Sequence, residues 1–319
     1  MPPTIYIDGH VGTTGLRIRE WLAEDADLEL LTLPEAQRKD EAARRDAIAA
    51  ADVAVLCLPD AAAIEAAAWA EAAGTRVVDA STAHRVADGW IYGLPELCDG
   101  QRARIAGAGR VSNPGCYPTG YLLLLRPLVD AGLVAPTLPT TVHALSGYTG
   151  GGRPLIERWE DAAGELASLV YEAPYSLDRV HKHVPEMCAY GGLQHEPQFV
   201  PSVGPFRCGM RIQVPIPAEC LEVGVSGKAM WEALDARYRD EPYVRVEPIQ
   251  DPLESDEHSF DPRRCNDTNR VDLRLLPHPS GHVLLMAIFD NLGKGAAGAA
   301  IQNLNLMLGL PETRGLPVD

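Results

Sequence analysis

Residues 4–22 read TIYIDGHVGTTGLRIREWL, and this stretch decides the fold of the first part of the chain. The apolar run at 4–8 is rich in β-branched residues and predicts a buried strand, and the segment after the glycines fits one apolar helical face. Gly9, Gly12 and Gly15 have the spacing GxxGxxG. A strand, a glycine turn and a helix in this order are typical of a dinucleotide site, where backbone N–H groups at the helix start hold a pyrophosphate. The spacing alone also suits a purely structural turn.

The same alternation of strand and helix continues over the first third of the chain. Buried strands are expected at 28–33, 52–59 and 76–81, separated by alanine-rich helical stretches around 40–50 and 61–73. Strands that alternate with helices predict a parallel, doubly wound sheet with right-handed crossovers. This part of the chain is therefore expected to be a Rossmann-like dinucleotide-binding domain.

The pattern of predicted secondary structure changes after Cys116, where the candidate strands are longer and follow one another more closely in the sequence. One is expected at 206–217, and 270–290 reads as a hairpin that turns at PHPSGH. The tail at 293–310 is helical again and is expected to pack on the first domain. The predicted fold class is α/β, with an α+β catalytic domain inserted into the dinucleotide-binding domain.

The predicted domain bounds follow from this change. The dinucleotide-binding domain covers 1–115 and is completed by a C-terminal helix at 291–319. The inserted domain, which would carry catalysis and oligomerisation, covers 116–290.

Composition limits the function classes. The 319 residues are 46% hydrophobic and 23% charged, which suits a soluble globular protein of two domains. A net charge of −16 argues against nucleic-acid and anionic-membrane partners. Apolar runs are too short to span a bilayer, and the N-terminus enters a strand at once, so neither a membrane span nor a signal peptide is expected. Seven cysteines without CxxC spacing predict reduced thiols and a cytoplasmic location.

The second strand is followed by residues that bear on the choice of cofactor. Glu35 would suit the ribose 2′-OH of NAD, whereas Arg38 and Lys39 would suit the 2′-phosphate of NADP. We expect NADP. The alternative is that Arg38 and Lys39 are an ordinary solvated helix start.

Cys116 lies in VSNPGCYPTG (111–120), directly before an apolar helical run. Pro118 suits a first helical turn, which places Cys116 at or just before the helix N-terminus. A free thiol with a pKa of about 8.5 is only about 3% thiolate at pH 7, and a helix dipole contributes about 1 kcal/mol, less than one pKa unit. A catalytic Cys116 therefore needs a cationic neighbour. The alternative is a buried packing cysteine, but the turn residues on both sides favour a nucleophile.

The candidates for this neighbour lie in HKHVPEM (181–187). His181 and His183 lack the companion ligands of a zinc site, so no metal is expected. A histidine paired with the cysteine would stabilise the thiolate and later transfer a proton. Either histidine is alternatively a surface residue.

Six segments in this order resemble the N-acetyl-gamma-glutamyl-phosphate reductases of the shorter bacterial type. They are IYIDGHVGTTGLRIREWL, VVDASTAHR (77–85), VSNPGCYPTG, SGYTGGGR (146–153), HKHVPEM and NLGKGAAGAAIQNLNLMLG (291–309). The resemblance implies NADPH-dependent reduction of N-acetyl-L-glutamyl 5-phosphate to N-acetyl-L-glutamate 5-semialdehyde and phosphate, through a cysteine thioester, in arginine biosynthesis. It also implies an architecture like aspartate-semialdehyde and glyceraldehyde-3-phosphate dehydrogenases, and a homo-oligomer, either dimer or tetramer.

The resemblance also implies roles for individual residues. Cys116 would be the nucleophile and His183 the acid/base, with His181 as the second candidate. The residues expected to contact substrate are Arg85, which would hold the phosphate, and Ser146, Gly147, Arg153, Tyr175 and His181. The residues expected at the cofactor are Gly9, Gly12, Thr13, Thr14, Gly15, Arg38, Lys39, Ser81 and Asn291.

Some of these positions have alternative, purely structural interpretations. Arg85 would otherwise make a structural ion pair at a strand end, and TGGGR would be a turn that caps the following helix. Lys294 would be a solvated residue.

Other functions stay open at this point. A cysteine hydrolase or acyltransferase would use Cys116 and His183 but has no reason to carry a dinucleotide turn, and a silent Rossmann-type sensor has no reason to keep the thiol. A related reductase of lysine biosynthesis acts on a carrier-bound acyl phosphate, and one of aspartate-semialdehyde type is a further alternative. The chain has no basic run to grip an acidic carrier, which favours the free N-acetylated substrate.

Overall fold

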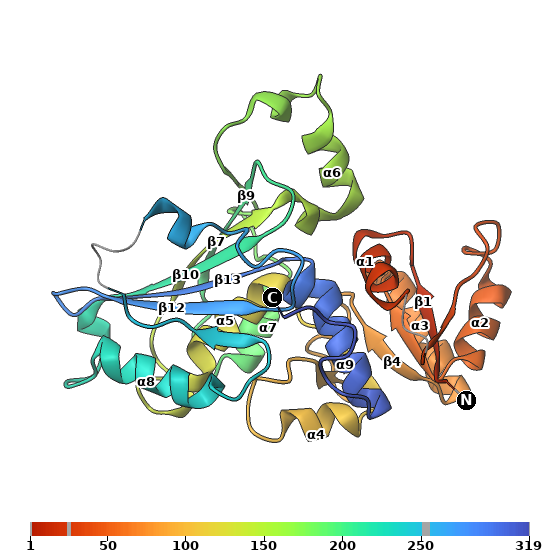
Figure 1. Cartoon of the computed structure of the whole chain (residues 1–319), viewed down its shortest axis with the longest axis horizontal. Coiled ribbons are helices and arrows are strands. Elements are labelled where there is room, and N and C mark those ends of the chain that lie inside the picture. The colour runs from red at the N-terminus through yellow and green to blue at the C-terminus, as the bar shows by residue number, and fades with distance from the viewer. Residues whose placement is uncertain (1, 24–26, 251–255, 319) are drawn as a thin grey trace. The chain divides into compact units, whose positions relative to one another are not determined.

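The computed structural model of the protein describes residues 2–23, 27–250 and 256–318 (Figure 1). Two compact units are present. Unit 1 comprises Met1–Pro95, Asp99–Gly115 and Ala296–Leu316, and unit 2 comprises Glu96–Cys98, Cys116–Gly295 and Pro317–Asp319. Each unit contains one sheet.

The sheet of unit 1 has six strands in the order β2-β1-β3-β4-β6-β5, and every neighbouring pair is parallel. The strands are β1 (Thr4–Asp8), β2 (Glu29–Leu31), β3 (Val53–Leu56), β4 (Arg76–Asp79), β5 (Ile91–Tyr92) and β6 (Arg110–Ser112). The expected strands at 28–33, 52–59 and 76–81 are present but shorter. Pro34 and Pro59 follow two of them and have no N–H to donate to a ladder.

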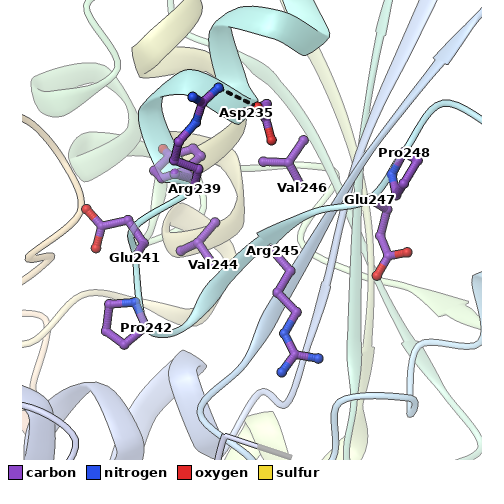
Figure 2. A pocket seen from close by; sticks show the side chains of 10 residues that line it. Asp235, Arg239, Glu241, Pro242, Val244, Arg245, Val246, Glu247 and Pro248 are labelled. Atoms are coloured by element: carbon purple, nitrogen blue, oxygen red, sulfur yellow. Dashed lines mark hydrogen bonds and ion pairs between the residues drawn. The ribbon is translucent and has the colours of Figure 1, made fainter.

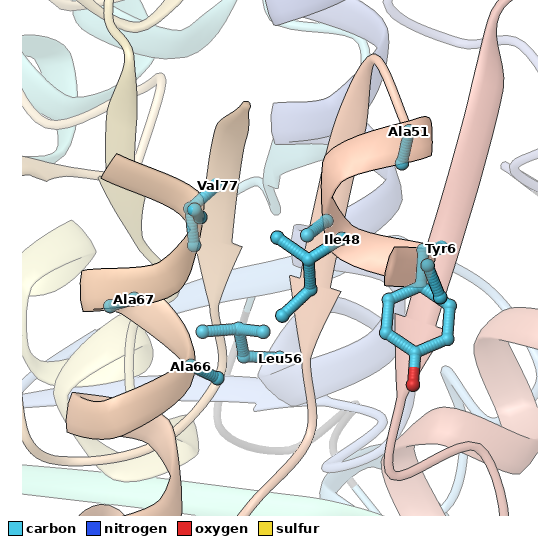
Figure 3. Packing of buried hydrophobic residues seen from close by; sticks show 10 residues of the cluster. Tyr6, Ile48, Ala51, Leu56, Ala66, Ala67 and Val77 are labelled. Carbon is cyan, nitrogen blue, oxygen red and sulfur yellow. The ribbon is translucent and has the colours of Figure 1, made fainter. Parts of the chain in front are cut away.

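The helices of unit 1 are α1 (Thr13–Leu22), α2 (Glu41–Ala50), α3 (Asp60–Ala73), α4 (Gln101–Ala106) and α9 (Gly298–Leu308). Asp40 caps α2 by accepting the N–H of Ala43 at 2.8 Å. Small side chains such as Ala66 and Ala67 let α3 pack closely beside Leu56 and Val77 (Figure 3). α9 packs against α1, α4 and β4, so the C-terminal helix is part of this unit.

The sheet of unit 2 has seven strands in the mixed order β11-β12-β13-β10-β7-β9-β8. The strands are β7 (Thr141–Gly147), β8 (Ala173–Pro174), β9 (Gln198–Gly204), β10 (Met210–Ile216), β11 (Val244–Val246), β12 (Val271–Pro277) and β13 (Val283–Phe289). The expected hairpin at 270–290 is the antiparallel pair β12–β13. The strand expected at 206–217 begins only at Met210, because Gly209 has a φ of 116°, outside the extended region.

The helices of unit 2 are α5 (Cys116–Asp130), α6 (Gly152–Glu160), α7 (Val184–Tyr190) and α8 (Gly227–Tyr238). Short 3₁₀ helices lie at Tyr148–Gly151, Glu165–Ser168, Ala218–Cys220 and Glu257–Phe260, and a π-helix lies at Gly293–Ala297. α5 packs on β10 and β13. A Cβ at Gly120 would lie 2.7 Å from Ile212 and 2.8 Å from Phe289, so the helix rests directly on the sheet.

Pro127 lies inside α5 and has no N–H for the carbonyl of Leu123, four residues earlier. The hydroxyl of Tyr238, at the end of α8, donates to that carbonyl at 2.9 Å. A side chain from α8 therefore completes the hydrogen bonding of α5.

None of the helices within 2–23, 27–250 and 256–318 combines the length and the apolar character that crossing a membrane requires.

Candidate active site

Cys116 is the first residue of α5 and is partly buried. Cys116 and the six other cysteines, all within the described residues, form no disulfide. The position at the start of a 15-residue helix gives the thiolate the favourable end of the helix dipole. Gly295 packs against it: a Cβ at that position would lie 2.9 Å from the Cβ of Cys116. Only glycine allows the π-helix to approach the thiol so closely.

Tyr117, the residue after Cys116, joins an aromatic cluster that contains both histidines. Its ring centroid lies 5.6 Å from that of His183, 5.8 Å from that of His181 and 5.1 Å from that of Phe199. The two imidazole centroids are 4.9 Å apart. All of these side chains belong to unit 2, and the structure thus brings the HKH segment to the start of α5.

Hydrogen bonds define the state of His181. The backbone N–H of His183 donates to Nδ1 of His181 at 3.2 Å. A neutral imidazole carries one ring proton, and because Nδ1 accepts, we assign that proton to Nε2. Nε2 lies 3.3 Å from the hydroxyl of Tyr175, to which it therefore donates. Both ring nitrogens of His181 are thus engaged in holding the site together.

The tyrosines of the cluster keep their protons at neutral pH. The pKa of Tyr175 is raised to about 12, mainly by burial and to a smaller extent by Cys116, while the hydrogen bond with Tyr117 acts in the opposite direction. Burial also raises the pKa of Tyr117 well above its usual range, with added contributions from Tyr175 and Cys116. The charge of Cys116 thus reaches both hydroxyl groups.

Ser146 and Gly147 end strand β7 beside this cluster. Ser146 is 2% exposed, donates to the carbonyl of Gly147 at 3.0 Å and is hydrogen-bonded to Tyr117. A Cβ at Gly147 would lie 2.5 Å from the carbonyl oxygen of Arg207, so the chain packs too tightly there for any side chain.

Asn291, which was expected at the cofactor, lies in unit 2 and supports the backbone there. Its Oδ1 accepts the N–H of Gly209 at 2.8 Å, and its Nδ2 donates to the hydroxyl of Thr149 at 3.0 Å. Thr149 in turn donates to the carbonyl of Arg207 at 2.7 Å. These bonds fix the segment that follows β7.

Arg153 lies at the start of α6 and is 80% exposed. Its Nε donates to Glu157 at 2.7 Å, one helical turn away. The structure therefore shows Arg153 in a surface ion pair, while Cys116, Ser146, Tyr175 and the histidines belong to buried or partly buried surroundings.

The glycine turn of unit 1 has the geometry of a phosphate cradle. Gly9 has a φ of 88°, and a Cβ there would lie 2.2 Å from the carbonyl oxygen of Cys57. A Cβ at Gly15 would lie 2.6 Å from the carbonyl oxygen of Gly9, whereas Gly12 meets only ordinary contacts. Thr13 and Thr14 begin α1.

Within the described residues, no side chain caps the N-terminus of α1 and no acidic residue lies in its first turn. The N–H groups at this helix end therefore suit a bound anion such as a pyrophosphate.

Glu35, which would favour NAD, and Arg38, which would favour NADP, contact each other in the structure. Arg38 forms an ion pair with Glu35, and Lys39 is exposed. Asp40, not a basic residue, caps the following helix. The carboxylate that would suit NAD is thus neutralised by the guanidinium that would suit NADP.

Arg85 and Ser81 lie after strand β4. Nε of Arg85 donates to the carbonyl of Asn113 at 3.1 Å, and the guanidinium also donates to the carbonyl of Ala80 at 3.3 Å. Ser81 donates to the buried Asp79 at 2.7 Å. The guanidinium of Arg85 is therefore held by two backbone carbonyls. One belongs to Asn113, three residues before Cys116, and the other to Ala80, the residue after β4.

Three features of the two units were not predicted from the sequence. The solvated reading of Lys294 is wrong: Lys294 is fully buried and its Nζ donates to both carboxylate oxygens of Glu96, at 2.7 and 2.8 Å. His84, whose Nδ1 lies 2.6 Å from Asp79, stacks on Trp90. Tyr117 lies within the motif VSNPGCYPTG, and its contacts with both histidines and Tyr175 are not apparent from the sequence.

A cavity of about 460 Å³ lies around the end of α8 and strand β11 (Figure 2). Asp235, Arg239, Glu241, Arg245 and Glu247 supply its charged groups, and Arg239 donates to Asp235 at 2.8 Å. Of the described residues that line it, none is among those expected at the active site. Across residues 2–23, 27–250 and 256–318, no three His, Cys, Asp or Glu side chains gather as a metal site would require.

Two family models match the chain. The model described as "Semialdehyde dehydrogenase, NAD binding domain" matches residues 4–105, and the one described as "Semialdehyde dehydrogenase, dimerisation domain" matches residues 116–291. The chain therefore contains a dinucleotide-binding domain and a dimerisation domain of the semialdehyde dehydrogenase type.

Curated relatives share one description. An N-acetyl-gamma-glutamyl-phosphate reductase of Burkholderia cenocepacia is 49% identical over 96% of this chain and 97% of its own. The N-acetyl-gamma-glutamyl-phosphate reductase 2 of Pseudomonas putida is 47% identical over 98% of this chain and 99% of its own.

Solved structures of lower identity share the fold. Aspartate semialdehyde dehydrogenase II of Vibrio cholerae, complexed with ASA, has a TM-score of 0.73 at 16% identity over 97% of this chain and 99% of its own. Aspartate semialdehyde dehydrogenase of Candida albicans, with NADP, has a TM-score of 0.65 at 15% identity, over 97% and 99%.

Proposed function

Because the chain belongs to the N-acetyl-gamma-glutamyl-phosphate reductase family, we propose that it reduces N-acetyl-L-glutamyl 5-phosphate to N-acetyl-L-glutamate 5-semialdehyde and phosphate with NADPH. The reaction would serve arginine biosynthesis. The observation that carries the proposal is Cys116 at the start of α5, followed directly by a tyrosine whose ring contacts both histidines of HKH.

In the first step the thiolate of Cys116 attacks the carbonyl carbon of the acyl phosphate. The start of α5 stabilises the oxyanion that forms, because backbone N–H groups and the positive end of the helix dipole favour negative charge there. The carbonyl then re-forms, the C–O bond to phosphate breaks and a thioester remains on Cys116. We assign Arg85 to the substrate phosphate, a role that suits a guanidinium.

In the second step the thioester is reduced. NADPH, when bound, would supply a hydride to the carbonyl carbon of the thioester. His183 protonates the carbonyl oxygen, which gives a thiohemiacetal on Cys116. His183 removes the hydroxyl proton as the C–S bond breaks, which releases the aldehyde and restores the thiolate.

We assign the proton transfer to His183 rather than His181. His181 accepts the His183 backbone N–H at Nδ1 and donates to Tyr175 from Nε2, so its ring is committed to hydrogen bonds that hold the site. Proton transfer through His181 would break one of these bonds in every cycle. Ser146, Gly147, Tyr175, His181 and Arg153 remain the residues that we propose for substrate contact.

The glycine turn at the start of α1 fits the pyrophosphate of the cofactor. We propose that Gly9, Gly12, Thr13, Thr14 and Gly15 hold it. Arg38, Lys39, Ser81 and Asn291 complete the proposed cofactor set. A homo-oligomer, dimer or tetramer, and a cytoplasmic location, where free thiols stay reduced, are the remaining parts of the proposal.

The direct test is the reverse reaction with purified protein. N-acetyl-L-glutamate 5-semialdehyde, inorganic phosphate and NADP are expected to give NADPH, and no NADPH should form without phosphate. L-aspartate 4-semialdehyde serves as the control substrate. NADP reduction that does not need phosphate, or that prefers the aspartate compound, would contradict the proposal.

Cofactor choice provides a second prediction. Arg38→Ala with Lys39→Ala is expected to weaken NADPH binding at least about tenfold, because up to a few kcal/mol of phosphate pairing is lost, and to leave NADH binding within about twofold. The measurement is the Kd of each nucleotide by fluorescence titration. Arg45→Ala, which removes an exposed arginine paired with Glu41 on α2, is the control. Equal effects on NADPH and NADH would show that the basic pair is only a helix start.

A further inference from the structure

Tyr117 is buried, follows Cys116 directly and takes part in neither of the two reaction steps proposed above. Its hydroxyl lies between two others: Tyr175 donates to it at 3.0 Å, and it is hydrogen-bonded to Ser146. Its ring contacts both histidines. Tyr117 thus contacts both histidines, Tyr175 and Ser146.

The hydrogen bonds around Tyr117 run in one direction. The backbone N–H of His183 donates to His181, and His181 donates to Tyr175. Tyr175 donates to Tyr117. Ser146 is hydrogen-bonded to the Tyr117 hydroxyl as well, so the oxygen of Tyr117 is held beside both Tyr175 and Ser146.

The direction of this chain matters for His181. Each hydroxyl has a single proton, so a reversal at any point requires a reversal at all of them. The series begins at the backbone N–H of His183, which only donates, so Nδ1 of His181 accepts, Nε2 donates to Tyr175 and Tyr175 donates to Tyr117. This fixed end sets the direction of all three bonds.

We propose that Tyr117 is a positioning residue for the proposed reaction: its hydroxyl holds His181 in the Nε2–H tautomer through Tyr175, and its ring supports the imidazole of His183. The inference rests on the proposed function. Without the Tyr117 oxygen, Tyr175 loses its acceptor and turns its proton toward Nε2 of His181. The ring proton of His181 then moves to Nδ1, where it opposes the N–H of His183 and loosens the turn that places the acid/base.

The chain offers a matched control on the same helix. Tyr121 is also a buried tyrosine of α5, and its hydroxyl lies 3.0 Å from that of Thr140. Burial raises its pKa to about 12, as it does for Tyr175. Tyr121→Phe therefore removes a buried, hydrogen-bonded hydroxyl from α5 without interrupting the hydrogen bonds that connect Tyr117, Tyr175 and His181.

The first readout is the tautomer of His181, observed by NMR on ¹⁵N-histidine-labelled protein. The signals of His181 are assigned from their loss in His181→Asn. Wild type and Tyr121→Phe are expected to show an Nε2–H ring, and Tyr117→Phe is expected to show a mixture of both tautomers. An unchanged Nε2–H pattern in Tyr117→Phe would overturn the inference. This readout needs no substrate, so it stands whether or not the proposed reaction is found.

The second readout is kinetic. Tyr117→Phe is expected to lower kcat about tenfold with a smaller change in KM, because a loosened His183 slows proton transfer more than substrate binding. Tyr121→Phe is expected to stay within about twofold of wild type. Tyr117→Leu, which also removes the ring, is expected to lower kcat further. A tautomer mixture with an unchanged kcat in Tyr117→Phe would refute the positioning role and leave the proposed function intact.

Discussion

Cys116→Ser is expected to lower kcat by about three to six orders of magnitude, because a hydroxyl is a much poorer nucleophile than a thiolate at neutral pH. The protein should remain folded, since one heavy atom changes at the partly buried start of α5. The measurement is phosphate-dependent reduction of NADP, with circular dichroism and NADPH binding as controls for folding. Activity within about tenfold of wild type would remove the thioester from the mechanism.

The same experiment can test whether Cys116 and His183 act as one unit. If the imidazole supplies most of the activation of the thiol, His183→Asn should slow turnover steeply, and the double variant should be little worse than Cys116→Ser alone. His183→Asn is also expected to shift the pH midpoint of iodoacetamide labelling at Cys116 upward, toward that of an unassisted thiol. His181→Asn is the matched control, and a shift in His181→Asn alone would move the role to His181.

Lys294→Met is expected to cost about 3–5 kcal/mol of unfolding free energy, because it leaves the Glu96 carboxylate buried without its ammonium partner. Both side chains are fully buried, and the ammonium also lies 5.7 Å from the ring centroid of Tyr243. The measurement is the shift of the urea midpoint at constant protein concentration.

Two further variants separate charge from general damage. Lys228→Met, which breaks an exposed pair with Glu232, is expected to cost less than about 1 kcal/mol. Glu96→Leu combined with Lys294→Met is expected to recover much of the loss, since no charge then remains buried alone. A loss in Lys294→Met no greater than that in Lys228→Met would show that the buried pair contributes little to stability.

Local patterns predicted much of the fold. The βα alternation, the glycine turn and Pro118 depend on neighbouring residues, and the structure has the expected parallel sheet, an uncapped helix after the glycines and Cys116 as the first residue of α5. The family expected from the motifs is confirmed by the relatives. The ends of the strands were harder to predict than their positions. The apolar run in the sequence continues for some residues beyond the last residue that pairs with a neighbouring strand.

Contacts between distant residues were not predictable. Lys294 stands between two glycines, a setting typical of a solvated turn, and its partner Glu96 lies 198 positions earlier. The position of Tyr117 between Tyr175 and Ser146 depends on how β7, β8 and α5 pack together. The local hydrophobic periodicity of the sequence carries no information on this packing. The ion pair of Glu35 with Arg38 likewise concerns side-chain geometry, although the two residues are near neighbours.

The proline inside α5 has a consequence for the order of assembly. The carbonyl that Pro127 leaves open is filled by a hydroxyl 115 positions further along the chain. During synthesis at about 5–20 residues per second, α5 therefore waits several seconds for Tyr238 to emerge before its hydrogen bonding is complete. The entropy cost of closing so long a loop comes before the stabilising contact forms, so the packing of α8 on α5 is expected late in folding. The helix that begins with Cys116 is complete only then.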